Sequence, residues 1–199
     1  MDWLINLDTD IFLAINGWHS SWMDEVMWWI SYKYTWIPVY AIILYALVRK
    51  LGWKKTGLTV LGIGLVVLLA DQLSSGLFKP WIARPRPCHL EELQGLVHTV
   101  NGKCGGSYGF VSSHAANFFA LATFIGAFFS RSFRIGAFSV AILVAYSRIY
   151  LGVHYPGDVI GGAVIGSLCG LTVLLVFRKL VIPRWDLFTN SPPSGTRPD

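Results

Sequence analysis

Three short polar stretches interrupt an otherwise apolar sequence, and their residue types point to chemistry on an anion. They are KPWIARPRP (79–87), GFVSSHAAN (109–117) and SRIYLGVHYPGD (147–158). Their cations and titratable groups are Lys79, Arg84, Arg86, Arg148, His114, His154 and Asp158. Charges in apolar surroundings are costly, so several that converge indicate a functional site. Fixed cations beside helix N-termini favour a multiply charged anion, most simply phosphate.

The histidines add reactivity to this anion site. A neutral imidazole is nucleophilic near neutral pH, and a carboxylate on its other nitrogen fixes its tautomer and orientation. His154 and Asp158 have the spacing for such a pair if the turn between them leads into a helix, with Asp158 as the expected N-cap. His114 is then the candidate that protonates a leaving alkoxide. Ser112 and Ser113 are expected to cap the helix that follows them.

The same residues also allow plainer interpretations. Lys79 and Arg148 can be interfacial anchors, and Arg84 can contact either a phosphate or a lipid headgroup. Asn117 either supports the site or only packs. The pair of His154 and Asp158 can be a structural hydrogen bond, or half of a metal site completed by His114, Glu91 or Glu92. Asp71, an acid inside an apolar block, is expected to bond a neighbouring helix rather than to act in catalysis.

The composition of the whole chain indicates a membrane protein. Of its 199 residues, 54% are hydrophobic and only 14% are charged, which excludes a disordered chain, a nucleic-acid-binding tail and a small disulfide scaffold. Five apolar blocks are each close to the ~20 residues that a spanning helix needs. They are residues 34–48, 56–78, 115–129, 133–151 and 159–177. The sequence therefore predicts an all-α transmembrane helix bundle of five spans, or of six if the N-terminal segment also crosses.

Two terminal segments differ from this bundle. In residues 1–25, Leu4, Leu7, Ile11 and Ile15 recur at helical spacing between acidic residues, which predicts an amphipathic helix on the membrane surface. Residues 186–199 are rich in Pro, Ser and Gly, which predicts a flexible tail. The predicted organisation is an interfacial segment (1–25), a transmembrane phosphate-binding domain (26–185) and the tail.

The basic residues give an orientation. They cluster after the first, third and fifth blocks, as Arg49, Lys50, Lys54, Lys55, Arg131, Arg134, Arg178, Lys179 and Arg184. The positive-inside rule makes that side cytoplasmic, with the C-terminus. The three polar stretches then face the periplasm or the cell exterior. Cys88 and Cys104 lie in an outward connection, where they are either a disulfide or two free thiols.

The three stretches resemble the signature of the type-2 phosphatidic acid phosphatase family, which is related to vanadium haloperoxidases. The first family motif is Lys, six residues, Arg-Pro, as in Lys79 and Arg86-Pro87. The second is Pro-Ser-Gly-His, which here reads Val111-Ser112-Ser113-His114. The third is Ser-Arg, five residues, His, three residues, Asp, which Ser147-Arg148, His154 and Asp158 match at every fixed position. The motifs cover about 40% of the chain, in the order of the family.

The resemblance implies a mechanism. His154 attacks phosphorus, Asp158 holds its imidazole, and His114 protonates the leaving oxygen and then activates water. Lys79, Arg86, Arg148 and the backbone of Ser113 stabilise the phosphoryl oxygens. The resemblance implies no metal and no cofactor, because cations of the protein take that part. The second motif departs from the family at Val111 and Ser113, so a side chain stands where the backbone approaches phosphate. That side chain either tightens the pocket or adds a hydroxyl donor.

Three classes of function follow. The first is an integral lipid phosphatase of the cytoplasmic membrane, acting at its outer face on undecaprenyl diphosphate, phosphatidylglycerol phosphate, phosphatidic acid or a lipid A phosphate. The second is vanadate-dependent halide oxidation, which the apolar composition disfavours because such enzymes are typically soluble. The third is a non-catalytic phospholipid-binding or transport protein, which the intact histidines disfavour. The expected partner is the lipid in its membrane and no nucleic acid, and the oligomeric state is left open.

Overall fold

The computed structural model describes residues 2–184 as a helical protein. The predicted tail at 186–199 lies outside the described residues. The α-helices are α1 (Asp2–Asn16), α2 (Ser21–Ser31), α3 (Ile37–Leu51), α4 (Trp53–Asp71), α5 (Lys79–Ile82), α6 (Ser113–Gly126), α7 (Arg131–Tyr150) and α8 (Pro156–Leu180). A π-helical segment, Gln72–Phe78, joins α4 to α5. Within the described range, β-pairing is limited to one isolated bridge between Pro85 and Tyr108, so the predicted all-α class is confirmed.

The five predicted spans coincide with α3, the continuous α4–α5 unit, α6, α7 and α8. Three helical stretches in the described residues are long and apolar enough to cross a membrane: Trp53–Ile82, Arg131–Tyr150 and Pro156–Arg184. The other two helices, α3 and α6, have 15 and 14 residues. This is shorter than the ~20 residues of a typical span, so the count of five spans stays a prediction.

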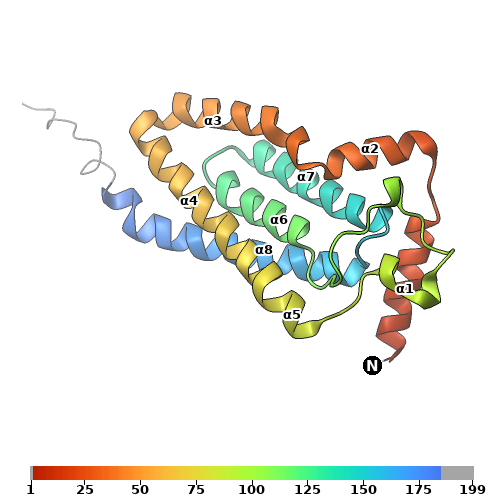
Figure 1. Cartoon of the computed structure of the whole chain (residues 1–199). Helices are drawn as coiled ribbons and strands as arrows, with labels where there is room; N and C mark the ends of the chain where they lie inside the picture. The colour runs from red at the N-terminus through yellow and green to blue at the C-terminus, as the bar shows by residue number, and fades with distance from the viewer. Residues whose placement is uncertain (1, 185–199) are drawn as a thin grey trace, which may run out of the picture.

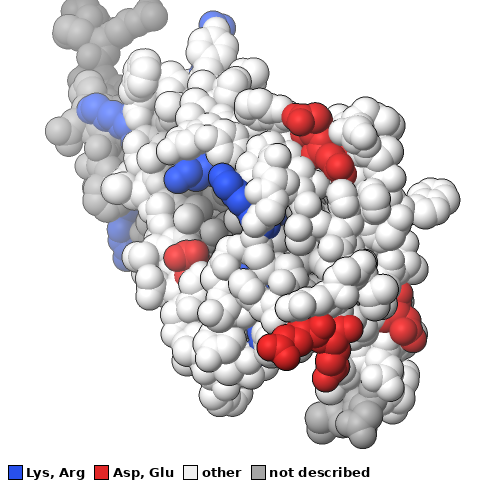
Figure 2. All heavy atoms as spheres, turned by 45° about the vertical axis from the view of Figure 1, so that its right-hand side comes forward, with Lys and Arg blue, Asp and Glu red and all other residues white. Residues whose placement is uncertain are grey.

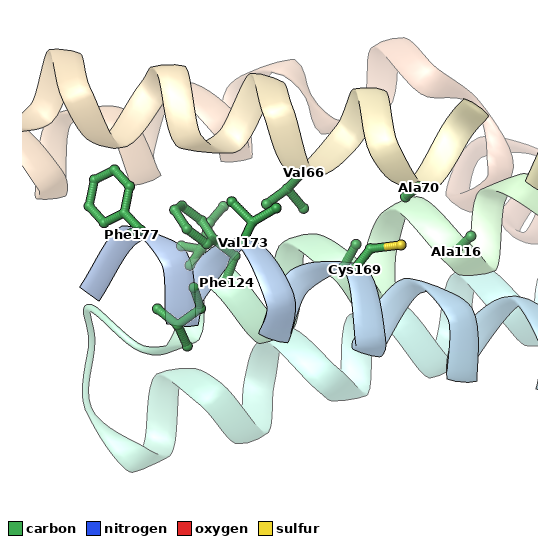
Figure 3. Close-up of a cluster of buried hydrophobic side chains, with 10 residues drawn as sticks. Val66, Ala70, Ala116, Phe124, Cys169, Val173 and Phe177 are labelled. Atoms are coloured by element: carbon green, nitrogen blue, oxygen red, sulfur yellow. The ribbon is translucent and has the colours of Figure 1, made fainter. Parts of the chain in front are cut away.

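The core lies where α4, α6 and α8 meet (Figure 3). Val66 and Ala70 come from α4, Ala116 and Phe124 from α6, and Cys169, Val173 and Phe177 from α8. Helix α6 also contacts α7, so it is the central helix of the bundle. Because α6 begins at the second polar stretch and α8 at the end of the third, the packing of these two helices sets the geometry of the candidate site.

Small residues let α6 and α8 approach closely. Gly162, Gly166 and Gly170 are spaced four apart along α8, and a Cβ at each would meet backbone atoms of α6. At Gly166 the added carbon would overlap the carbonyl of Ala116. Small residues at this spacing are a common device for close helix contact in membranes.

Replacing Gly166 by alanine is expected to force the two helices apart. Overpacking of this kind typically costs about 1–3 kcal/mol, so the thermal unfolding midpoint in detergent should fall by about 2–12 °C for a chain of this length. Gly64→Ala on α4 is the matched control, because nothing lies within 4 Å of a Cβ there. Equal midpoints for the two variants would contradict this account of the α6–α8 contact.

The N-terminal helices pack against the ends of α7 and α8. Phe12 of α1 is buried, and the Asn16 amide donates to the Tyr150 carbonyl at 2.7 Å. The Tyr150 hydroxyl in turn donates to Asp24 of α2 at 2.7 Å. Helix α2 runs across the expected boundary at residue 25. These contacts tie α1 and α2 to the chain that leads into the third polar stretch.

The bundle has two chemically different ends (Figure 1). The α3–α4 turn, the α6–α7 connection and the end of α8 lie on the left of the view, and these are the places where the clustered basic residues occur. The loops of residues 83–112, with α1 and α5, lie at the opposite end. All three polar stretches reach that second end.

Candidate active site

Backbone hydrogen bonds join the three polar stretches at one end of the bundle. The amide of Gly109 in the second stretch donates to the Arg84 carbonyl of the first at 2.8 Å. The amide of Ser112 donates to the Asp158 carbonyl of the third at 2.9 Å. The three polar stretches therefore converge in the structure, as predicted.

His154 and Asp158 form a buried pair at the start of α8. His154 is 1% exposed and Asp158 is fully buried, and His154 Nδ1 lies 3.3 Å from Asp158 Oδ2. Gly109 allows this arrangement, because a Cβ there would lie 2.7 Å from Asp158 Oδ2. With Nδ1 held by the carboxylate, Nε2 is the nitrogen available to a reactant.

Asp158 does not occupy the predicted N-cap position. Helix α8 begins at Pro156, Tyr155 is the N-cap, and Asp158 is the third helical residue. Its Oδ2 accepts the Tyr155 amide at 3.1 Å, as the acidic residue of a capping box does. Helix capping and orientation of His154 therefore depend on one carboxylate. The prediction was wrong by one turn because proline at the first helical position started the helix earlier.

The electrostatics around His154 favour its neutral form. Burial lowers the pKa of His154 well below its usual value, and the charges of Arg148, Arg86 and Lys79 lower it further. The same three cations and His154 act electrostatically on His114. The predicted histidines and cations thus lie within one electrostatic environment, and the His154 imidazole is uncharged at neutral pH.

Arg86 is held by the loop that follows it. Its side chain is 7% exposed, its Nε donates to the Tyr108 carbonyl at 3.1 Å, and its Nη1 donates to the Cys104 carbonyl at 3.1 Å. Cys104 forms a disulfide with Cys88, with the Cα atoms 5.9 Å apart. Burial lowers the pKa of Arg86, an effect that the charge of Asp158 opposes, and arginine remains charged.

The Arg148 guanidinium makes one side-chain hydrogen bond and has one buried N–H donor without a partner among the described residues. Its Nη1 donates to the Ser31 hydroxyl at the end of α2. Its buried Nε has no hydrogen-bond partner among the described residues. A buried donor without a partner is unusual in proteins, and this one is chemically suited to an anion.

The second stretch forms the N-terminus of α6. Ser112 is the N-cap residue, but its buried hydroxyl makes no capping bond and has no partner in residues 2–184. The Ser113 hydroxyl instead accepts a hydrogen bond from Lys79 Nζ at 3.0 Å. Hydroxyl capping of α6, the expected role of the two serines, is therefore absent. Asn117 lies one turn on, and its buried Oδ1 is unpartnered within the described chain.

The Arg84 guanidinium forms ion pairs with two carboxylates. Its Nη1 lies 2.7 Å from Asp8 Oδ2 and 3.1 Å from Asp158 Oδ1, and its guanidinium carbon lies 3.9 Å from the Tyr155 ring centroid. Asp8 also accepts the Gly157 amide at 2.8 Å. Sequence reasoning missed Asp8, because no local pattern in α1 connects it to Arg84 and Gly157, which lie 76 and 149 positions further along the chain.

A pocket of about 580 Å³ opens from the site between α3, α4 and α6. Asp71, Ser113 and His114 line one part, and apolar side chains such as Leu47 and Phe118 line much of the rest.

Figure 2, which is turned toward the end with α1 and the loops, shows Lys and Arg side chains near the middle of that face with acidic side chains around them. In the described residues, His, Cys, Asp and Glu side chains nowhere gather in threes that could hold a metal ion.

Chemically, this arrangement suits displacement at a tetrahedral anion. It offers a neutral, oriented imidazole as nucleophile and a second imidazole for proton transfer. Cations and a helix N-terminus are available to stabilise negative charge. The adjoining apolar pocket suits a hydrocarbon chain.

Known proteins share the sequence and the fold. Residues 59–182, which include all three polar stretches, match the PAP2 superfamily. The chain is 39% identical over 183 residues to a lipid A 4'-phosphatase of Bacteroides thetaiotaomicron, covering 90% of this chain and 81% of that protein. It is 38% identical over 178 residues to a lipid A 4'-phosphatase of Porphyromonas gingivalis, covering 89% and 75%. The solved structure of a transmembrane PAP2 type phosphatidylglycerolphosphate phosphatase from Bacillus subtilis matches with a TM-score of 0.70 and 26% identity, over 92% of this chain and 90% of that one.

Proposed function

The chain belongs to the PAP2 superfamily, and we propose that this membrane lipid phosphatase hydrolyses a phosphate monoester of a lipid A type glycolipid through a phosphohistidine on His154. The observation that carries the chemistry is the buried pair of His154 and Asp158 among three cations. The lipid A class is supported by the two relatives of 38% and 39% identity, both lipid A 4'-phosphatases.

The reaction has two displacements. His154 Nε2 attacks phosphorus, the bond from phosphorus to the lipid oxygen breaks, and His114 donates a proton to that oxygen. In the second step His114 accepts a proton from water, the water oxygen bonds to phosphorus, and the phosphorus–nitrogen bond breaks to release phosphate. Asp158 keeps Nδ1 as the hydrogen-bond donor throughout, so Nε2 carries the lone pair that attacks.

Protein donors bind the phosphoryl oxygens. Lys79, Arg86 and Arg148 supply the cations, and Ser113 supplies its amide at the N-terminus of α6. The free Nε of Arg148 and the unpartnered Ser112 hydroxyl support this binding set. Asn117 supports the site from one turn further along α6. Arg84 is assigned to ion pairing rather than to phosphate binding, because its Nη1 contacts the carboxylates of Asp8 and Asp158.

The pocket between α3, α4 and α6 holds a hydrocarbon chain of the lipid. It joins the site at His114, and its walls include Trp36, Leu47 and Phe118. A substrate bound there places its phosphate at the polar end, next to the histidines.

The active site faces the periplasm or the cell exterior in this proposal. The clustered basic residues lie at the opposite end of the bundle, which the positive-inside rule assigns to the cytoplasm. The disulfide in the loop beside Arg86 suits an oxidising compartment. The exposed side chains of Leu4, Leu7 and Ile11 suit an α1 that lies against the membrane surface.

A phosphate-release panel with the purified full-length protein tests the substrate. We expect release from a lipid A phosphate to exceed release from phosphatidylglycerol phosphate, phosphatidic acid and undecaprenyl diphosphate by about tenfold or more. Orthovanadate should inhibit the reaction, and a chelator should leave it unchanged.

The possible outcomes of the panel test the lipid A substrate class and the enzymatic function separately. Faster turnover of another lipid would overturn the lipid A class alone. Lipid binding with no phosphate release from any member of the panel would overturn the enzymatic function.

A further inference from the structure

A π-helical segment aligns three polar side chains of the second span. Asp71, Ser75 and Lys79 are spaced four apart, and the residues from Gln72 to Phe78 are π-helical. In a regular α-helix of 3.6 residues per turn, positions eight apart are rotated by about 80°. The larger number of residues per turn in a π-helix offsets part of this rotation. π-Helical turns occur often at functional sites, and this one lies beside Ser113 of α6.

A directed chain of hydrogen bonds connects these residues through Ser113. Lys79 Nζ donates to Ser113 Oγ at 3.0 Å, and the Ser113 and Ser75 hydroxyl oxygens are 2.8 Å apart. Ser75 Oγ donates to Asp71 Oδ1 at 3.4 Å. Since the ammonium can only donate and the carboxylate can only accept, the Ser113 hydroxyl donates to Ser75. The chain runs from a cation to an anion, with each hydroxyl accepting one bond and donating one.

Ser113 is one of the two positions where the second motif departs from the family pattern, which has glycine there. A serine in the first turn of a helix tends to accept a hydrogen bond from backbone amides of that turn. Here such a bond would occupy backbone amides that the proposed function assigns to the phosphate. The bonds from Lys79 and to Ser75 hold the hydroxyl in one rotamer, on the side of the second span.

We propose that Asp71 and Ser75 are positioning residues that hold the Ser113 hydroxyl away from the phosphate and keep Lys79 at the site. The proposal rests on the proposed function, because it concerns the same phosphate position. It assigns a task to Asp71, which the displacement mechanism does not use. It also explains how a serine is accommodated where the motif has glycine.

The test is a coupling experiment on phosphate release from a lipid phosphate. Ser75→Ala and Asp71→Ala, each of which removes a hydrogen-bonding member of the chain, are made in the natural chain and in a Ser113→Gly background. In the natural chain we expect each to lower kcat by about tenfold, the effect of losing one or two hydrogen bonds. The KM should change little for Ser75→Ala, because Ser75 is not among the residues that line the pocket. In the Ser113→Gly background, whatever its own activity, neither substitution should lower kcat further.

Two matched variants complete the design. Ser74→Ala removes the neighbouring buried serine, whose hydroxyl donates to the main-chain carbonyl of Asp71 at 3.3 Å, and should leave kcat unchanged. Ser75→Thr retains a hydroxyl and should recover most of the loss seen with Ser75→Ala. Equal losses in both backgrounds, or equal losses for Ser74→Ala and Ser75→Ala, would overturn the proposal. If the natural chain releases no phosphate from any lipid, the proposed function itself has failed.

Discussion

Replacing His154 by alanine is expected to reduce phosphate release by about 10⁴-fold or more, the scale on which enzymes lose activity with their nucleophile. The imidazole is the one protein group that forms a bond to phosphorus in the proposed reaction. Its pKa is lowered by burial and then by the nearby cations, so it is present as the free base at neutral pH.

The intermediate gives this prediction a second measurement. Brief reaction with a substrate labelled in its phosphate should leave acid-labile label on the natural chain and none on the His154→Ala variant. His89→Ala is the matched control, since His89 is exposed in the loop after the first motif and should retain activity within about threefold. Label or turnover that persists in His154→Ala would assign the nucleophile to another residue.

Much of the fold followed from residue patterns that are local in the chain. Each of the five apolar blocks is a helix, because runs of apolar residues with few polar breaks leave the backbone no other way to pair its polar groups in a membrane. The spacing within the third motif also predicts that His154 lies beside Asp158, and the two side chains are 3.3 Å apart. Such inferences succeed because the partners are separated by one turn of the chain.

Contacts between distant segments were not predictable in this way. Arg84 is paired with Asp8 from α1, and the Arg148 guanidinium bonds to Ser31 of α2. The hydroxyl of Ser113 turns toward Ser75 rather than capping its own helix. Each choice depends on which helix lies opposite, and the apolar faces that decide this packing are similar in all five blocks. The hydropathy pattern likewise does not give the lengths of α3 and α6, which are 15 and 14 residues.

Replacing Asp158 by asparagine is expected to lower kcat by about 10²–10⁴-fold, as loss of the carboxylate that orients a catalytic histidine does elsewhere. The carboxylate accepts hydrogen bonds from His154 Nδ1 at 3.3 Å, from the Tyr155 amide at 3.1 Å and from Arg84 Nη1 at 3.1 Å. An amide has one acceptor oxygen and carries no charge, so it cannot satisfy all three donors. The histidine then loses the bond that fixes its tautomer, while the KM for the lipid should change little.

Asp8→Asn is the control that separates orientation from ion pairing. Asp8 contacts the same Arg84 guanidinium and the Gly157 amide but makes no contact with His154. The Asp8→Asn substitution should therefore lower kcat by less than about tenfold, because partly exposed ion pairs usually contribute little free energy. Since Asp158 also caps α8, both variants need thermal unfolding midpoints beside their rates, with about 1 kcal/mol expected from the cap. Equal losses of kcat at Asp8 and Asp158 would mean that the ion pairs of Arg84, and not the contact with His154, set the rate.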